Sequence, residues 1–231
     1  MTTGYNKKTI SLGLLLLITL GGCASLTPPV TRDLQTTLAI EDETDLDRVI
    51  AARLETFPGE SGAHVLKDGL DAFAARLAGA DQASRSIDAQ YYLFHDDVTG
   101  RLLAQRLLVA ANRGVAVRLL LDDIGIQGRD ADLLALHAHP NIEVRIFNPF
   151  ANRRFRLFEY LYRFGLVTRR MHNKSMIIDG VVAIAGGRNV GDEYYDAHEA
   201  SNFLDIDVMV FGPAVQGISD QYDEYWNSPL S

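Results

Sequence analysis

The chain has 231 residues, of which 47% are hydrophobic, and a formal net charge of −8 at pH 7. This length suits one domain of ordinary size, and the hydrophobic content is sufficient for a large buried core, which excludes an intrinsically disordered protein. The acidic balance argues against nucleic-acid binding by the whole surface, although a local basic patch could still hold a phosphate group.

Residues 1–22 have the pattern of an export signal. Two lysines precede an apolar run, 10–20, that is too short to cross a bilayer comfortably. The Leu-Gly-Gly-Cys tetrad that ends at Cys23 resembles the lipobox of bacterial lipoproteins. This resemblance implies cleavage before Cys23, lipidation of that cysteine and, with alanine next, a place on the periplasmic face of the outer membrane. An ordinary signal peptide with an incidental cysteine is the alternative.

Residues 23–47 are rich first in threonine and proline and then in acidic residues, which predicts a tether. The folded domain is expected over 48–231. Helical patterns occur at about 66–79, at 99–113, from Asp130 and over 213–225, and strand patterns at 86–94, 115–121, 143–147, 176–179, 181–185 and 203–211. Because 115–121 is nearly all apolar, both faces of its sheet should be covered. The alternation predicts an α/β fold with a mixed sheet flanked by helices.

His172 and Lys174 form the strongest chemical signal in the chain. On an extended segment, residues two apart point to the same face. An imidazole that attacks phosphorus or passes protons, beside an ammonium that stabilises phosphoryl charge, suits a phosphodiester. Gly186, Gly187 and Asn189 follow a predicted strand, where glycine amides can approach an anion and asparagine can donate another hydrogen bond. We therefore expect phosphate binding by Lys174, Gly186, Gly187 and Asn189.

Residues 172–179, His-Asn-Lys-Ser-Met-Ile-Ile-Asp, resemble the H-x-K-x4-D signature of the phospholipase D superfamily. The Gly-Gly-Arg-Asn at 186–189 stands in place of its G-S-x-N element and is similar to the bacterial cardiolipin synthase C type, a resemblance that extends over roughly 60–228. It implies a phospholipase D-like mixed sheet and a phosphohistidine intermediate, with no metal or other cofactor. His137 and His139 also lack the spacing of a convincing metal site.

The resemblance implies a role for individual residues. His172 would be the nucleophile, or the acid that protonates the leaving alcohol. Asp205 stands where the family supplies a carboxylate that orients the histidine and supports its protonated form. Asp179 belongs to the signature but lies on a predicted strand turn, so catalytic and structural roles are equally open. Gly187 replaces the serine of many relatives and removes a hydroxyl that could contact phosphate.

Family enzymes build one active site from two such motifs, because one histidine attacks while the other handles the leaving group. This sequence contains one motif. Either two copies pair as a homodimer with two-fold symmetry, or the chain is one half of the usual two-motif pseudo-dimer and inert alone. The match to a two-motif family favours truncation.

Residues 150–170 mix aromatic side chains with arginines that only Glu159 opposes, namely Arg153, Arg154, Arg156, Arg163, Arg169 and Arg170. This mixture suits an anionic lipid surface, although it could also stack single-stranded nucleic acid or simply pack on the sheet. The lipobox and the resemblance favour phospholipid over nucleic acid. We expect a phospholipase D-type phosphatidyltransferase or phosphodiesterase acting on anionic phospholipids in a membrane, cardiolipin synthase-like. The alternatives are a single-motif nuclease and a catalytically inert half-enzyme lipoprotein.

Four aspartates lie at the ends of predicted strands, namely Asp96, Asp97, Asp122 and Asp123. Capping and turn formation are the expected roles of such residues. Lining the site of the acceptor alcohol is the alternative.

Overall fold

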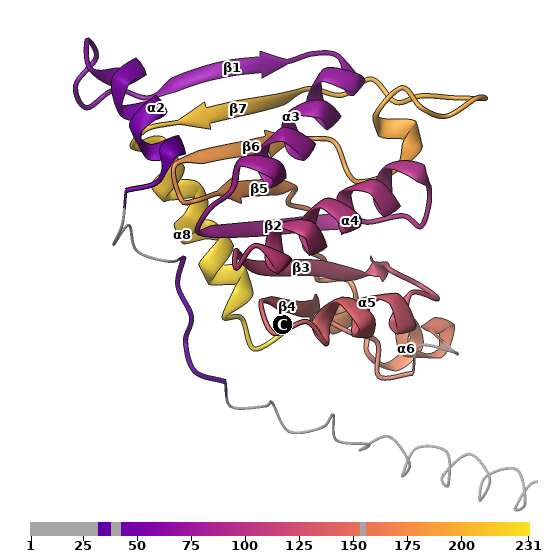
Figure 1. The fold of residues 1–231 in the computed structure, drawn as a ribbon. Helices are drawn as coiled ribbons and strands as arrows, with labels where there is room; N and C mark the ends of the chain where they lie inside the picture. The colour runs from indigo at the N-terminus through magenta and orange to yellow at the C-terminus, as the bar shows by residue number, and fades with distance from the viewer. Residues whose placement is uncertain (1–31, 38–42, 153–155) are drawn as a thin grey trace, which may run out of the picture.

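A computed structural model describes residues 32–37, 43–152 and 156–231. The predictions on residues 1–22 and on Cys23 lie outside these residues. A seven-stranded sheet in the order β1-β7-β6-β5-β2-β3-β4 organises the described chain (Figure 1). Its strands are β1 (Gly62–Leu66), β2 (Ser86–Leu93), β3 (Ala116–Gly125), β4 (Ile142–Phe147), β5 (Ser175–Ile178), β6 (Val182–Gly186) and β7 (Asp207–Phe211). Strands β2, β3 and β4 are parallel and the other pairings are antiparallel, so the predicted mixed sheet is confirmed.

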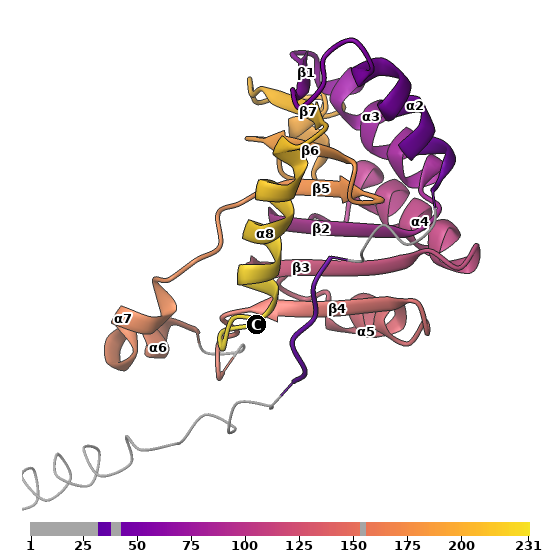
Figure 2. The same ribbon diagram turned by 90° about the vertical axis from the view of Figure 1, so that its left-hand side faces the viewer.

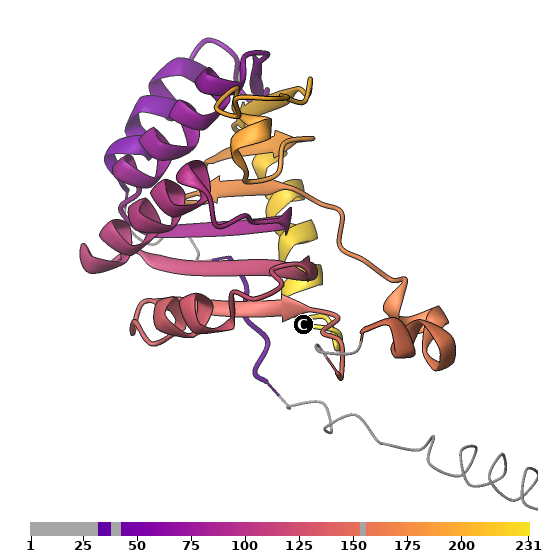
Figure 3. The ribbon, with the colours of Figure 1, turned by 90° about the vertical axis from the view of Figure 1, so that its right-hand side faces the viewer.

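Helices cover both faces of the sheet (Figures 2 and 3). One face carries α2 (Asp45–Leu54), α3 (Gly69–Gln82), α4 (Val98–Asn112) and α5 (Asp130–His137), and the other carries α8 (Ala214–Trp226). Two short helices, α6 (Arg156–Tyr162) and α7 (Phe164–Val167), project from one edge, and a 3-10 turn, η1, spans Asp192–Tyr194. None of the helices in the described ranges is long and apolar enough to cross a membrane.

The side chains of β3 show why its sequence is almost wholly apolar. Successive strand residues point to opposite faces. Leu119 and Leu121 therefore join the large core cluster under α3 and α4, while Leu120 joins the smaller cluster that contains Tyr222 and Trp226 of α8. The prediction that both faces of this strand are covered is confirmed.

Strand β1 and helix α2 were not predicted, and β7 begins at Asp207 rather than at 203. Three of the five β1 residues are exposed, so the strand has little hydrophobic alternation, and its place at the sheet edge comes from pairing with β7. Residues 203–206 are mostly exposed and lie outside the sheet.

The segment 32–37, within the predicted tether, packs on the domain near the starts of β3 and β4. The backbone N–H of Gln35 donates to Asn227 Oδ1 at 3.0 Å, and Gln35 Nε2 donates to Glu143 at 2.9 Å. The N–H of Thr37 donates to Asp223 Oδ2 at 2.8 Å. This segment, which we call the N-terminal strap, therefore joins α8 to β4.

Candidate functional site

His172 and Lys174 lie in the extended segment that enters β5. Because β5 is antiparallel to β2 and β6, this segment reaches the sheet edge at which β2 and β6 end. The carboxyl ends of parallel strands are the usual ligand-binding edge of an α/β sheet. We call this end of the sheet, at which β2 and β6 end, the motif edge, as distinct from the lateral edges formed by β1 and β4.

Tyr92, at the end of β2, brings the two motif side chains together. The ring of the exposed His172 lies 4.9 Å from the Tyr92 ring, centroid to centroid. Lys174 is 5% exposed, and its Nζ lies 5.4 Å from the centroid of the same ring and donates a 2.6 Å hydrogen bond to the His172 carbonyl. The prediction that His172 and Lys174 share a face is therefore confirmed, whereas the role of Tyr92 was missed.

Asp205 lies against Gly187 and close enough to Lys174 to act on its charge. A Cβ at position 187 would lie 1.8 Å from Asp205 Oδ1, so the two residues are in direct contact. Burial lowers the pKa of Lys174, and the negative charge of Asp205 raises it in part. The structure thus brings together His172, Lys174 and Asp205, as expected for a site that handles phosphoryl charge.

The predicted phosphate-binding donors of the 186–189 loop already have protein partners. The N–H of Gly186 donates to the Lys174 carbonyl at 3.3 Å, and that of Gly187 donates to the Ile206 carbonyl at 3.2 Å. The Asn189 side chain accepts from the N–H of Leu93 at 3.0 Å and donates to the hydroxyl of Tyr194 at 2.9 Å. These contacts fix the loop between its neighbours, and phosphate binding by Gly186, Gly187 and Asn189 stays a prediction.

Asp179 lies at the far end of β5, away from His172 and Lys174. One of its oxygens accepts from the backbone N–H groups of Arg85 and Ser86, at 2.7 and 3.0 Å, and both oxygens accept from Ser84. Its φ of 51° places it in the tight turn before Gly180. This position supports the structural interpretation of Asp179.

Asp122, at the end of β3, holds the segment that leads into His172. One oxygen accepts from the N–H of Met171 at 2.9 Å, and the other pairs with Arg170 at 3.0 Å. Burial raises the pKa of Asp122, while Arg170 and backbone donors oppose that effect. The sequence singled out Asp122 as a strand-end aspartate but not as a support for the catalytic segment.

Among the described residues, His95, Asp97 and Glu193 form one group that could geometrically hold a metal ion. His95 Nδ1 lies 3.2 Å from Glu193 Oε1. Both oxygens of Asp97 are engaged by backbone donors, namely Gly100, which Asp97 caps, and Asp192. These contacts account for the group as a link between α4 and η1, and the sequence gives no reason to expect a metal here.

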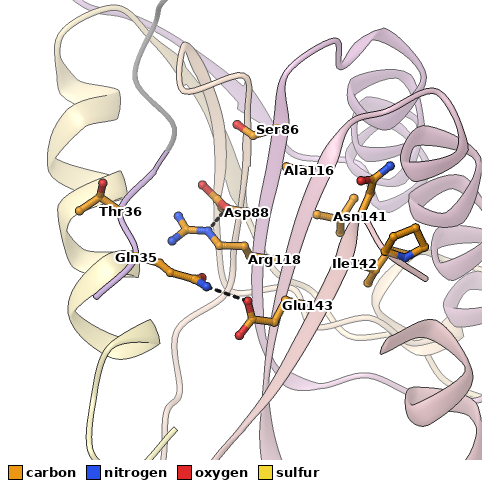
Figure 4. A pocket seen from close by; sticks show the side chains of 11 residues that line it. Gln35, Thr36, Ser86, Asp88, Ala116, Arg118, Asn141, Ile142 and Glu143 are labelled. Atoms are coloured by element: carbon orange, nitrogen blue, oxygen red, sulfur yellow. Dashed lines mark hydrogen bonds and ion pairs between the residues drawn. The ribbon is translucent and has the colours of Figure 1, made fainter. Parts of the chain in front are cut away.

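A pocket of about 490 Å³ lies between the N-terminal strap and the starts of β2, β3 and β4 (Figure 4). Arg118 crosses it and pairs with Asp88 at 2.6 Å and Asp223 at 2.8 Å. Burial raises the pKa of Asp88, and Arg118 lowers it in part. This pocket is at the sheet edge opposite the motif edge, and no motif residue lines it.

Comparison with known proteins places these features in a family. Residues 77–226 match the family model described as cardiolipin synthase, PLD-like domain. Cardiolipin synthase C of Escherichia coli K12 is 51% identical over 169 residues, which cover 73% of this chain and 36% of that protein. Cardiolipin synthase A of Pseudomonas putida GB-1 is 32% identical over 163 residues, or 70% of this chain and 32% of that protein. The chain thus spans about a third of the length of these curated relatives.

Two solved structures share the fold. NucT from Helicobacter pylori has a TM-score of 0.56 at 19% identity, covering 73% of this chain and 96% of NucT. Nuc from Salmonella typhimurium, described as a phospholipase D family member, has a TM-score of 0.52 at 21% identity, covering 73% of this chain and 95% of Nuc. At these identities the likeness shows the fold alone.

Proposed function

The chain belongs to the cardiolipin synthase, phospholipase D-like family, and on this premise we propose that it acts on phospholipid phosphodiesters, transferring a phosphatidyl group to an alcohol or to water. The observation that carries the proposal is the convergence of His172, Lys174 and Asp205 at the motif edge. The 51% identity to a cardiolipin synthase C supports phospholipid as the substrate class.

The proposed reaction has two steps at phosphorus. In the first, a ring nitrogen of His172 attacks, the bond from phosphorus to the leaving alkoxide breaks, and the alkoxide takes a proton from a second acid. In the second, an alcohol or water attacks the phosphohistidine and gives its proton to the conjugate base of that second acid, and the phosphorus–nitrogen bond breaks, which frees His172. An acceptor phosphatidylglycerol gives a cardiolipin-like lipid, and water gives phosphatidic acid. Lys174 stabilises the charge on the phosphoryl oxygens in both steps.

The second acid is the group that this motif does not supply. We propose that it comes from a second histidine motif, either in another copy of this chain or in a further part of a longer protein. The length of the relatives is compatible with both sources.

The direct test is to incubate the chain with vesicles of labelled phosphatidylglycerol and phosphatidylethanolamine beside its His172→Ala variant. Lipid products and oligomeric mass are measured together. Turnover by a dimer that disappears in the variant supports the proposal with two copies completing one site. A folded monomer without turnover points to a second motif on another polypeptide segment, and turnover that survives His172→Ala contradicts the proposed nucleophile.

A nuclease is the second candidate, because NucT and Nuc share the fold. Cleavage of single-stranded DNA that disappears in His172→Ala and falls steeply with salt would favour it. The acidic net charge of the chain and its higher identity to cardiolipin synthases favour a phospholipid substrate over nucleic acid.

We also propose export and lipid anchoring through Cys23, on the outer membrane facing the periplasm. Metabolic labelling with a fatty-acid analogue tests this directly. Label on the chain and none on Cys23→Ser is expected, whereas equal label on both would contradict lipidation at this residue.

A further inference from the structure

Helices α6 and α7 form a short hairpin with an inverted distribution of side chains. Leu157 and Leu161 are each 79% exposed and Phe164 is 64% exposed. A spacing of four residues places Leu157 and Leu161 along one face of α6, and Phe164 is the first residue of α7. Glu159, in contrast, is fully buried. A surface helix of a soluble protein normally turns its apolar stripe inward and its charges outward, so this hairpin has the opposite arrangement.

Three arginines of the hairpin and of the segment that follows it, Arg156, Arg163 and Arg170, are paired within the protein. Arg163 pairs with Glu159 at 2.5 Å, and Arg170 pairs with Asp122 at 3.0 Å. Arg156 donates to the Asp123 carbonyl at 3.0 Å. Within residues 150–170 of the sequence, Glu159 is the only acidic residue. The fold adds Asp122 and Asp123 of β3, which lie beside Arg170 and Arg156. Among the side chains of α6 and α7 that the structure describes, the exposed large ones are therefore apolar rather than basic, which does not suit a nucleic-acid backbone.

The hairpin is attached to the motif edge. It projects from the body of the domain at that edge (Figures 2 and 3). Arg170, just beyond α7, and Met171 are both bonded to Asp122, and His172 follows directly. Whatever covers the hairpin is consequently held next to the nucleophile.

A second copy of the chain is a poor match for this surface by itself. The exposed apolar side chains that the structure describes in it are Leu157, Leu161, Phe164 and Leu166. They present on the order of 500 Å², taking about 200 Å² for a large apolar side chain, against roughly 800 Å² per partner in a stable interface. A lipid surface has no such requirement, because each side chain that enters it gains its transfer free energy separately.

We propose that the α6–α7 hairpin inserts its apolar face, Leu157, Leu161 and Phe164, into the lipid bilayer and so brings the motif edge to the membrane surface. The inference rests on the proposed function, since it names where the phospholipid substrate lies relative to His172. Because Arg156, Arg163 and Arg170 are paired within the protein, we expect apolar transfer to drive insertion, so that insertion persists in about 0.5 M salt and on neutral phosphatidylcholine.

Single-site labelling tests the insertion at the level of one side chain. Cys23 is the only cysteine, so Cys23→Ser combined with Leu161→Cys gives one position for an environment-sensitive dye in the full chain. The matched control is Val49→Cys on α2, which is 52% exposed. Helix α2 lies at the end of the sheet opposite the motif edge, where its Asp47 pairs with Arg85, the residue before β2.

With phosphatidylcholine vesicles, and with vesicles containing phosphatidylglycerol, the label at position 161 is expected to shift to shorter wavelength and to be quenched by lipids brominated on their acyl chains. The label at position 49 should do neither. No shift at 161 with either vesicle overturns the proposal. A shift that needs protein concentration but no vesicles also overturns it and identifies a second copy as the occupant, and binding only to anionic vesicles at low salt overturns the apolar mechanism.

Lipid turnover, followed in the same samples, separates this inference from the proposed function. Insertion without lipid products leaves the hairpin proposal standing and means that this chain alone does not carry out the proposed reaction. Lipid products without insertion leave the proposed function standing and overturn the hairpin proposal. The variant Leu157→Asp/Leu161→Asp gives a second readout. It should lower turnover of vesicle lipid about tenfold or more and leave turnover of a monomeric short-chain phosphatidylglycerol unchanged, while equal losses on both substrates would contradict a membrane role.

Discussion

Lys174 is held between two opposing influences on its charge. Burial lowers its pKa, and the Asp205 carboxylate raises it. The ammonium must be protonated to stabilise phosphoryl charge, so activity should fall as the pH rises through the pKa of Lys174. The Asp205 carboxylate therefore favours the protonated form of Lys174, and the orientation of His172 by Asp205 stays a prediction.

Asp205→Asn separates these two roles. Without the carboxylate the pKa of Lys174 falls, so the alkaline limb of the pH–rate profile should move to lower pH, whatever happens to the maximal rate. The check is the midpoint of that limb, measured against the unmodified chain. A limb that stays in place while the rate drops would mean that Asp205 acts on His172 alone.

Two neighbouring glycines should respond differently to an added methyl group. At Gly187 the three atoms nearest to an added Cβ all belong to the Asp205 side chain, which can rotate, whereas at Gly186 the Cβ would lie 2.5 Å from the Ile206 carbonyl and 2.6 Å from Asp207 Cα. Gly187→Ala should lower turnover about tenfold with the melting temperature within about 2 °C, because it displaces a site carboxylate. Gly186→Ala should lower the melting temperature by about 8 °C, because backbone must move. Calorimetry and turnover assays on both variants provide the check, and equal thermal losses would contradict the distinction.

The sequence revealed the parts of the site whose spacing is local. His172 and Lys174 are two residues apart, so extended geometry alone places them on one face, as the structure has them. Tyr92 and Asp122 could not be found in this way, because they reach the site through the pairing of β2 with β5 and through the end of β3. Such contacts depend on strand order, which composition and periodicity do not specify.

At the level of secondary-structure elements, the junction between α3 and β2 depends on a residue from another part of the chain. Asp179 at the β5–β6 turn accepts hydrogen bonds from three successive backbone N–H groups, those of residues 84, 85 and 86. The carboxylate is fully buried. It thus fixes where β2 begins relative to β5, and the register of these two strands carries Tyr92 to His172.

Asp179→Ala should be destabilising rather than catalytically specific. The loss of a buried acceptor leaves three amides without their partner and should lower the free energy of unfolding by about 3 kcal/mol. Denaturant titration measures this loss, and turnover per folded molecule should stay within about twofold. A stable variant without turnover would instead support a catalytic role for Asp179.

The interior elements were readable from the sequence and the edge elements were not. Strand β3 is apolar on both faces because a hydrophobic cluster packs on each of them, and its nearly all-apolar sequence indicates this. Strand β1 has three exposed residues in a row and is a strand only because β7 offers it hydrogen-bonding partners. Hydrophobic periodicity does not reveal such a strand, because its side chains are mostly exposed and need not alternate between apolar and polar.

On the scale of the whole molecule, the N-terminal strap connects parts of the domain that are remote in sequence. Gln35 contacts Asn227, Glu143 and the ring nitrogen of Trp226, which donates to Gln35 Oε1 at 2.8 Å. The strap lies at the edge opposite the motif. A substitution in the strap should therefore lower the stability of the domain without changing its activity.

Gln35→Ala should lower the melting temperature by about 4 °C, because it removes two side-chain hydrogen bonds that together contribute about 1–2 kcal/mol. Turnover at 25 °C should not change. Leu34→Ala is the matched control, since that neighbouring side chain is 83% exposed and should leave the melting temperature unaltered. If Gln35→Ala impairs turnover without affecting stability, the strap communicates with the motif edge.

The pairing of β1 with β7 imposes an order of events on folding. Gly62 is opposite Phe211, so these partners are nearly 150 residues apart, and Gln35 and Asn227 are separated by 192 positions. The local parallel unit of β2, β3 and β4 can form while the rest of the chain is still absent, because its contacts close short loops. The sheet edge and the strap have to wait for β7 and α8. A nascent chain consequently carries an unpaired β1 until β7 has been synthesised, and keeping that strand from pairing with other chains becomes a task for the cell's folding machinery.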